Sequence, residues 1–281
     1  MYILGISAYY HDSAATLLYN DKIVAAAQEE RFTRIKHDAS FPINAIKYCL
    51  EFSHIGISDI KAVAFYDKPF LKFERLIETY TINVPKGLSS FLKAVPVWTK
   101  EKLFLKKIIR DELKKIGNLK KIDAPVLFPE HHLSHAASAF FASPFHTSAI
   151  LIADGVGEWA TTTIAFGENN KITTLKELHF PHSLGLLYSA VTYYCGFKVN
   201  SGEYKLMGLS PYATDDDEVN RLEKIINSVF CTAYPDGSIE LNQEYFTYAS
   251  GLRMVNDKKW TTCLGFSPRK PEPVLDRKSV V

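Results

Sequence analysis

The sequence predicts a mixed α/β fold in which a βββαβα unit occurs twice. Near the N-terminus, apolar runs separated by turns predict strands over residues 2–7, 14–19 and 23–27, with Asn20-Asp21 as a hairpin turn. A helix over 42–52 and a short strand over 61–65 follow. Pro42 suits the start of that helix, because its missing N–H would have no helical partner there.

The same order of elements recurs in the second half of the chain. Strands are predicted over 148–153, 160–166 and 171–178, and the Thr-rich stretch 162–166 corresponds to 15–19. A duplicated unit of this kind places a ligand cleft between two halves, with the first hairpin of each half gripping phosphates. The alternative is a chance similarity between two β-meanders.

Composition indicates a globular protein of more than one core-forming unit. The 281 residues are 47% hydrophobic and 23% charged, and the net charge is only +2. These values give no argument for nucleic acid or membrane as partners. The N-terminus reads as a strand rather than a signal peptide. The scattered cysteines, with no CxxC pair, favour a reduced, cytoplasmic protein.

Residues 70–121 are expected to form a basic, amphipathic helical insertion. Apolar residues recur at helical spacing in Leu103, Leu105, Ile108, Ile109 and Leu113. The basic residues are Lys86, Lys93, Lys100, Lys102, Lys106, Lys107, Arg110, Lys114, Lys115, Lys120 and Lys121. A solvated helical face is one interpretation, and a surface for an anionic ligand or a partner is the other. We therefore expect a first half over 1–145 that includes this insertion, a second, incomplete half over 146–266, and an irregular tail over 267–281.

The segment HHLSH at 131–135, followed by DGVGE at 154–158, is the most informative feature of the chain. On a helix, His131 and His135 lie one turn apart on the same face, where two imidazoles can hold one ion. Asp154, at the end of the next strand, can supply a third ligand beside a glycine-rich, phosphate-binding turn. The alternative is a pair of partly buried or capping histidines.

Further polar segments are candidates for binding or catalysis. His11 and Asp12 lie in the turn after the first strand, where they suit acid–base work, although adjacent residues of an extended chain point in opposite directions. The charged stretch 29–38 is expected to be a loop that either is solvated or binds a polar substrate. Ser183 is a plausible N-cap for the following helix. In 200–209, two glycines frame Glu203 and Lys205, which suggests either a phosphate contact or a plain turn.

Taken together, these segments resemble the NodU/CmcH-type carbamoyltransferases. The resemblance extends from residue 2 to about 272 and rests on seven motifs in matching order and spacing. These are GIS through HDSAA at 5–15, EERF at 29–32, KHD at 36–38, HHLSHAASAF at 131–140, DG at 154–155, FPHSLG at 180–185 and GEYKLMGL at 202–209.

The resemblance implies a fold and an activity. The N-terminal domain of the family is similar to Kae1/TsaD, with an actin-like ATPase (ASKHA) fold of two RNase H-like halves. A C-terminal domain similar to YrdC/Sua5 makes carbamoyl-adenylate from carbamoyl phosphate and ATP. The Kae1-like domain then transfers the carbamoyl group to a hydroxyl of a small-molecule or sugar acceptor.

The resemblance also implies roles for individual residues. His131, His135 and Asp154 would bind a metal, usually iron, although this donor set also suits manganese or zinc. His11 and Asp12 would lie at the transfer site and provide the base. Gly155, Gly157, Glu203 and Lys205 would lie near the nucleotide.

The chain departs from the family pattern at its C-terminal side. The YrdC-like domain and the later part of the second half, which supplies another metal-binding carboxylate, are missing, and Asp276 is not in a matching context. We therefore expect a truncated product with impaired activity. One alternative is a nucleotide- and metal-binding module that acts with a separately encoded YrdC-like partner. A sugar or acetate kinase is a further alternative, which the imidazole pair disfavours because Mg²⁺ prefers oxygen ligands.

Overall fold

The computed structural model describes residues 1–97 and 104–271, which form a mixed α/β protein of two compact units. The first unit contains residues 1–73 and 94–134, and the second contains residues 74–93 and the chain from 135 onward. Helices α3 (Pro69–Asn83) and α6 (His131–Phe140) each pass from one unit into the other. Among the described residues, no helix combines the length and apolar content needed to span a membrane.

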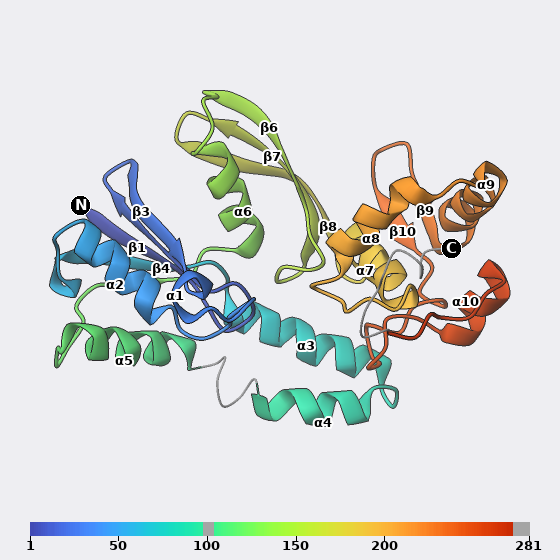
Figure 1. The fold of residues 1–281 in the computed structure, drawn as a ribbon, viewed down its shortest axis with the longest axis horizontal. Coiled ribbons are helices and arrows are strands. Elements are labelled where there is room, and N and C mark those ends of the chain that lie inside the picture. Colours follow the sequence, from blue (N-terminus) through green and yellow to red (C-terminus); the bar gives the residue numbers. More distant parts are fainter. Residues whose placement is uncertain (98–103, 272–281) are drawn as a thin grey trace. The chain divides into compact units, whose positions relative to one another are not determined.

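A five-stranded sheet organises the first unit (Figure 1). Its order is β3-β2-β1-β4-β5, with antiparallel pairing among the first three strands and parallel pairing of β1 with β4 and of β4 with β5. The bounds are β1 Tyr2–Ser7, β2 Ala14–Tyr19, β3 Lys22–Gln28, β4 Ile60–Phe65 and β5 Val126–Leu127. The strands predicted over 2–7, 14–19, 23–27 and 61–65 are therefore confirmed to within a residue at each end.

Helices pack on this sheet against apolar side chains that alternate along its strands. Helix α2 (Ile43–Phe52) follows Pro42 as predicted and contacts β2, β3 and α5 (Leu105–Gly117). Its buried residues join alternating strand residues in one core that includes Leu4, Leu17, Ile46, Val63, Ile109 and Leu113. A short 3₁₀ turn, Ile57–Asp59, precedes β4. The amphipathic pattern of the insertion is confirmed in α5, whose Leu105, Ile109 and Leu113 are buried.

The charged stretch after β3 differs from its prediction as a loop. Residues Glu30–Thr33 form α1, a single helical turn that Arg34 ends in the left-handed conformation at φ 59°. Glu29 is only 2% exposed, although charged side chains rarely are so buried. Its carboxylate accepts hydrogen bonds from the Asn44 and Ala45 backbone N–H groups, at 3.1 and 2.8 Å, and from Asn44 Nδ2 at 2.7 Å. Glu29 therefore caps α2 rather than binding a substrate.

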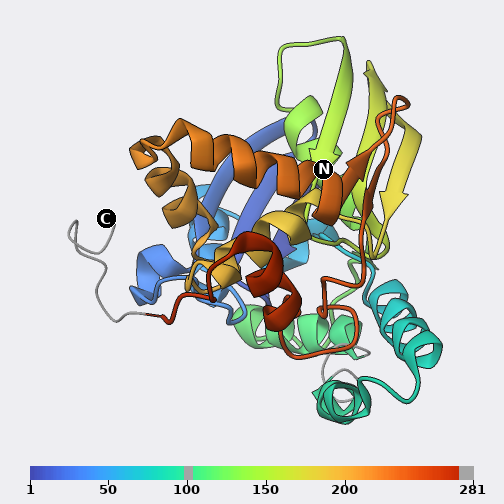
Figure 2. The ribbon, with the colours of Figure 1, turned by 90° about the vertical axis from the view of Figure 1, so that its right-hand side faces the viewer.

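The second unit contains a three-stranded antiparallel sheet, order β6-β7-β8, shown from two sides in Figures 1 and 2. Its strands, β6 Thr147–Ala153, β7 Ala160–Glu168 and β8 Lys171–His179, match the second predicted meander, and Asn169-Asn170 form the turn. Helix α6 packs on one face, where Phe140 lies so close to Gly167 that a Cβ there would fall 2.7 Å from the ring. Among the described residues, no further strand joins this sheet.

An aromatic core holds the remaining elements of the second unit. Trp260 stacks on Phe230 with ring centroids 4.4 Å apart and contacts Tyr194 at 5.1 Å. The surrounding elements are α7 Leu184–Tyr194, α8 Glu203–Leu209, a 3₁₀ turn Ser210–Tyr212, α9 Asp216–Ile225, a π-helical turn Ile226–Phe230, β9 Cys231–Ala233, β10 Ile239–Leu241 and α10 Asp257–Leu264. Residues 267–271 contain no helix or strand.

The insertion comprises α3, α4 (Leu88–Val97) and α5. Lys100, Lys102, Leu103 and the tail residue Asp276 lie outside the described residues. The predicted boundary between halves at residues 145 and 146 stays a prediction.

We predict that Glu29→Ala lowers the free energy of unfolding of the first unit by about 3 kcal/mol, since it leaves buried N–H donors at the start of α2 without an acceptor. Guanidinium unfolding at neutral pH measures this loss. The control is Glu51→Ala at an exposed position of the same helix, which should change stability by less than about 0.5 kcal/mol. Equal stabilities of the two variants would contradict the capping role.

Candidate functional site

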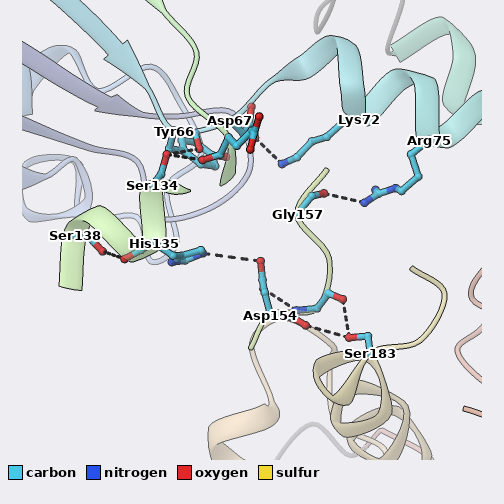
Figure 3. A network of polar contacts seen from close by, with 12 residues as sticks. Tyr66, Asp67, Lys72, Arg75, Ser134, His135, Ser138, Asp154, Gly157 and Ser183 are labelled. Carbon is cyan, nitrogen blue, oxygen red and sulfur yellow. Dashed lines mark hydrogen bonds and ion pairs between the residues drawn. The ribbon is translucent and has the colours of Figure 1, made fainter. Parts of the chain in front are cut away.

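Helix α6 brings the two predicted histidine ligands together. His131 and His135 lie one turn apart on this continuous helix, so both imidazoles share a face. Asp154 follows β6, and its Oδ2 lies 3.9 Å from His135 Nε2 (Figure 3). Each of the three side chains offers a ligand atom, and these atoms lie within 4.8 Å of one another. The residues predicted from spacing alone thus form a cluster of the size that one ion can bridge.

The first turn of α6 is tied to the end of β4. Ser134 Oγ donates to the carbonyl oxygen of Tyr66 at 2.9 Å (Figure 3). The Tyr66 ring meets the His131 imidazole edge-on, with centroids 5.6 Å apart. Burial, with a smaller contribution from the charge of Asp67, raises the pKa of Tyr66, so its hydroxyl stays protonated. An aromatic wall and a main-chain anchor therefore restrict the orientation of His131.

The loop that carries Asp154 is held against the start of α7. Ser183, the predicted N-cap, accepts from the Leu186 N–H at 3.0 Å, and its hydroxyl lies 3.0 and 2.7 Å from the carbonyl oxygens of Asp154 and Gly155. Gly185 is required here, because a Cβ would lie 2.5 Å from the Asp154 carbonyl oxygen. The N-cap predicted at Ser183 is confirmed, and Ser183 also fixes the backbone of the candidate ligand Asp154.

Arg75, on α3, holds the other side of the same loop. Its Nη1 donates to the carbonyl oxygen of Gly157 at 2.8 Å (Figure 3) and to that of Glu158 at 2.7 Å. Its guanidinium lies over the Phe180 ring, 5.5 Å from the centroid. No sequence pattern indicates this role, because Arg75 lies in a helix whose polar pattern is typical of a solvated surface.

The loop amides make internal hydrogen bonds. The Gly155 N–H donates to Asp154 Oδ1 at 2.6 Å, and the Gly157 N–H donates to the Ala160 carbonyl at 2.9 Å. These bonds order the turn and leave Asp154 Oδ2 as the oxygen that faces His135. Nucleotide contacts by Gly155 and Gly157 stay a prediction.

The segment at 200–209 is a helix start rather than a plain turn. Glu203 begins α8, and its carboxylate accepts from the backbone N–H groups of Asn200 and Gly202, at 3.0 and 3.1 Å, and from Ser189 Oγ at 2.9 Å. Burial raises the pKa of Glu203, but these hydrogen bonds outweigh burial and the net pKa is lowered. Lys205 is exposed. Glu203 therefore orders its own loop, and its predicted nucleotide role remains untested.

His11 and Asp12 do contact each other, because the turn after β1 is not extended. Asp12 has a left-handed φ of 51°, and His11 Nδ1 lies 2.8 Å from Asp12 Oδ2. The second carboxylate oxygen lies 2.9 Å from His37 Nδ1. Burial raises the pKa of Asp12, but the hydrogen bonds with His37 and then His11 prevail and lower it. His37, which the sequence analysis placed in a charged stretch and in the KHD motif without assigning it a role, thus belongs to the candidate transfer site.

We predict that Arg75→Ala loosens the loop that carries Asp154. Loss of two charge-assisted hydrogen bonds should lower the free energy of unfolding by about 2 kcal/mol and speed amide hydrogen exchange at Val156, Gly157 and Glu158. Hydrogen exchange read by NMR or mass spectrometry measures the effect. Arg31→Ala, at a side chain 70% exposed, is the control. Unchanged loop exchange in Arg75→Ala would exclude the clamp.

Comparison with known proteins adds independent information about the chain. It is 53% identical over 280 residues to an uncharacterized protein of Synechocystis sp., an alignment that covers 99% of this chain and 45% of that protein. It is 35% identical over 209 residues to the nodulation protein NolNO of Sinorhizobium fredii, covering 73% of this chain and 28% of that protein. The chain therefore spans less than half the length of these relatives.

A solved structure with some similarity is (R)-2-hydroxyglutaryl-CoA dehydratase component A of Acidaminococcus fermentans. It is 16% identical, with a TM-score of 0.35 over 79% of this chain and 72% of that chain, which is too low to support an argument. The family model described as the carbamoyltransferase N-terminus matches residues 2–264, a range that contains His11, Asp12 and the His131, His135 and Asp154 cluster. The chain belongs to the carbamoyltransferase family.

Proposed function

We propose that this chain is the carbamoyl-transferring portion of an O-carbamoyltransferase, acting on carbamoyl-adenylate made from carbamoyl phosphate and ATP. The acceptor is a hydroxyl of a small molecule or a sugar. The observation that carries the proposal is the family match over residues 2–264. The His11–Asp12 hydrogen bond and the His131, His135 and Asp154 cluster lie within this range and provide suitable chemistry.

The topology supports an actin-like ATPase fold for this activity. The sheet order β3-β2-β1-β4-β5, with a three-stranded antiparallel meander followed by two parallel strands, is that of an RNase H-like half. The β6-β7-β8 meander followed by α7 repeats the beginning of that pattern. In this interpretation, the turns after β1 and β6, which carry His11 and Asp154, correspond to each other as the first hairpins of two halves.

His11 is the proposed general base. When Nδ1–H donates a hydrogen bond to Asp12, Nε2 carries the lone pair. After Nε2 accepts a proton, the Asp12 carboxylate stabilises the resulting imidazolium. His11 Nε2 takes the proton of the acceptor hydroxyl as that oxygen bonds to the carbamoyl carbon. The bond from this carbon to the phosphate oxygen breaks, and AMP leaves with the electron pair. The side chain of His11 is 48% exposed, which leaves it accessible to an acceptor.

We further propose that His131, His135 and Asp154 hold iron or another divalent cation. The donor set, two imidazoles and a carboxylate, suits iron, manganese or zinc, and the closeness of the ligand atoms fits a single ion. A bound cation would stabilise the negative charge that develops on the phosphate of departing AMP. The residues of the chain serve this chemistry by fixing the ligands, through Ser183 and Arg75 on the Asp154 loop and Tyr66 beside His131.

The donor is proposed to come from a YrdC-like domain or chain. Relatives of this chain are more than twice as long as the segment that it matches. A separately encoded partner would make this chain a nucleotide- and metal-binding module with the same transfer chemistry. The experiment below therefore supplies the donor-forming activity from outside.

We predict that the chain binds one divalent cation through this cluster. Removing two ligands in His135→Ala with Asp154→Ala should weaken the binding of Fe²⁺ or Zn²⁺ at least about 100-fold, because imidazole and carboxylate ligation are lost together. Anaerobic isothermal titration calorimetry and metal analysis after dialysis measure affinity and stoichiometry. His179→Ala, which removes an exposed histidine of β8 outside the cluster, should bind as the parent does. Unchanged affinity in the double variant would refute the site.

Carbamoyl transfer itself is tested with a purified YrdC-class enzyme that forms carbamoyl-adenylate from ¹⁴C-carbamoyl phosphate and ATP. A panel of sugars and small hydroxylated compounds serves as acceptors. We expect the chain to promote AMP release and ¹⁴C incorporation into an acceptor at an impaired rate, and His11→Asn to reduce that rate by a further factor of about 100 or more through loss of the base. His54→Asn is the control, since His54 is, like His11, an exposed histidine, and it lies outside the candidate site. AMP release at the same rate with and without the chain would overturn the proposal.

A further inference from the structure

The Asp12 carboxylate is shared by two imidazoles. His11 Nδ1 lies 2.8 Å from Oδ2, and His37 Nδ1 lies 2.9 Å from Oδ1, so each oxygen has its own histidine partner. The two histidines come from different loops, separated by 26 residues in sequence, one after β1 and the other after α1. The three side chains are 37% to 48% exposed, so all remain open to solvent or a ligand.

Three residues around this contact have a left-handed backbone conformation. Tyr9, Asp12 and His37 have φ values of 69°, 51° and 57°, although none is glycine. Each such residue costs on the order of 1 kcal/mol and persists only where the surroundings impose it. Asp and His adopt this region more readily than most residues, so of the three positions Tyr9 carries the clearest strain.

Main-chain hydrogen bonds lock the two loops together on both sides of the carboxylate. The Tyr9 N–H donates to the Ala39 carbonyl, and the Ser13 N–H donates to the Asp38 carbonyl, each at 2.8 Å. The His37 N–H donates to Glu30 Oε2 at 3.1 Å. These main-chain hydrogen bonds fix the backbone of His37 without involving its imidazole. The imidazole points toward Asp12.

We propose that His37 is a positioning residue that holds the Asp12 carboxylate in the orientation that keeps the proton of His11 on Nδ1. A carboxylate with one hydrogen-bond donor can rotate about its Cβ–Cγ bond, whereas donors on both oxygens fix its plane. The fixed carboxylate then accepts from His11 Nδ1, and Nε2 keeps the lone pair that a base needs. The catalytic meaning of this arrangement rests on the proposed carbamoyl transfer, but the arrangement itself does not.

Three substitutions at His37 separate hydrogen bonding from backbone effects. Asn and Gly both accept a left-handed φ, so neither introduces new strain at 57°. The Asn amide nitrogen takes the approximate place of Nδ1 and can donate to Asp12, whereas Gly cannot. If His37→Gly does not fold, His37→Asp replaces it, since Asp has the shape of Asn and its carboxylate is no donor.

The tautomer of His11 is the decisive readout, measured by long-range ¹H–¹⁵N NMR on the folded chain at a pH where His11 is neutral. We expect the Nδ1–H form in the parent chain, in His37→Asn and in the control His54→Asn, and at least a twofold loss of this form in His37→Gly. An unchanged tautomer in His37→Gly, or an Nε2–H form in the parent, overturns the proposal.

The transfer assay then reports the consequence for catalysis. We expect His37→Gly to lower kcat about 10- to 100-fold with KM little changed, and His37→Asn to restore most of the loss. A kcat in His37→Gly equal to that of the parent would also overturn the proposal. A tautomer effect in a chain without transfer activity would instead refute the proposed function and leave the positioning role intact.

Discussion

The buried carboxylate of Glu29 is the constraint on which the first unit depends. It satisfies N–H groups at the start of α2, and the Glu29 backbone continues the pairing of β3 by donating to the Ser13 carbonyl at 2.8 Å. The sheet and the helix that covers it are thus joined at a single residue. The chain between them, residues 30–42, has its two ends fixed and must form a compact loop. His37 lies at the turn of that loop, which is why it reaches Asp12.

In the second unit, the loop that carries Asp154 is likewise fixed by side chains, through hydrogen bonds to its backbone carbonyls. Ser183 binds the carbonyls before the DGVGE turn, and Arg75 binds those after it. Neither residue is a candidate ligand, yet together they fix the backbone of Asp154 on both sides. Apolar packing does not fix the position of Asp154, since the apolar core on β6 and β7 ends at Ile152 and Ala165. Polar groups therefore determine the geometry of both candidate sites.

Periodic features of the chain were predictable from the sequence, and contacts between distant loops were not. The strands and α2 follow from apolar alternation and from Pro42, and the His131–His135 pair follows from helical spacing. By contrast, the α1 segment was predicted as a loop, and for 200–209 the alternatives were a phosphate contact or a plain turn. Both segments instead begin helices, where Glu30 and Glu203 accept from nearby backbone N–H groups, and a charge pattern does not reveal such bonds. The roles of His37 and Arg75 depend on positive φ values and on tertiary contacts, neither of which has a sequence period.

Three carboxylates of this chain illustrate how partners decide what an acidic group can do. Glu29 is enclosed, and its described partners are amide donors, so its charge is used entirely for structure. Asp12 is half-exposed between two imidazoles, which lets it bias where their protons reside. Asp154 accepts from its own loop through Oδ1 and turns Oδ2 toward His135, so one oxygen orders the turn and the other faces the candidate metal site. Chemical identity alone does not distinguish these roles, but the number and kind of donors around each oxygen do.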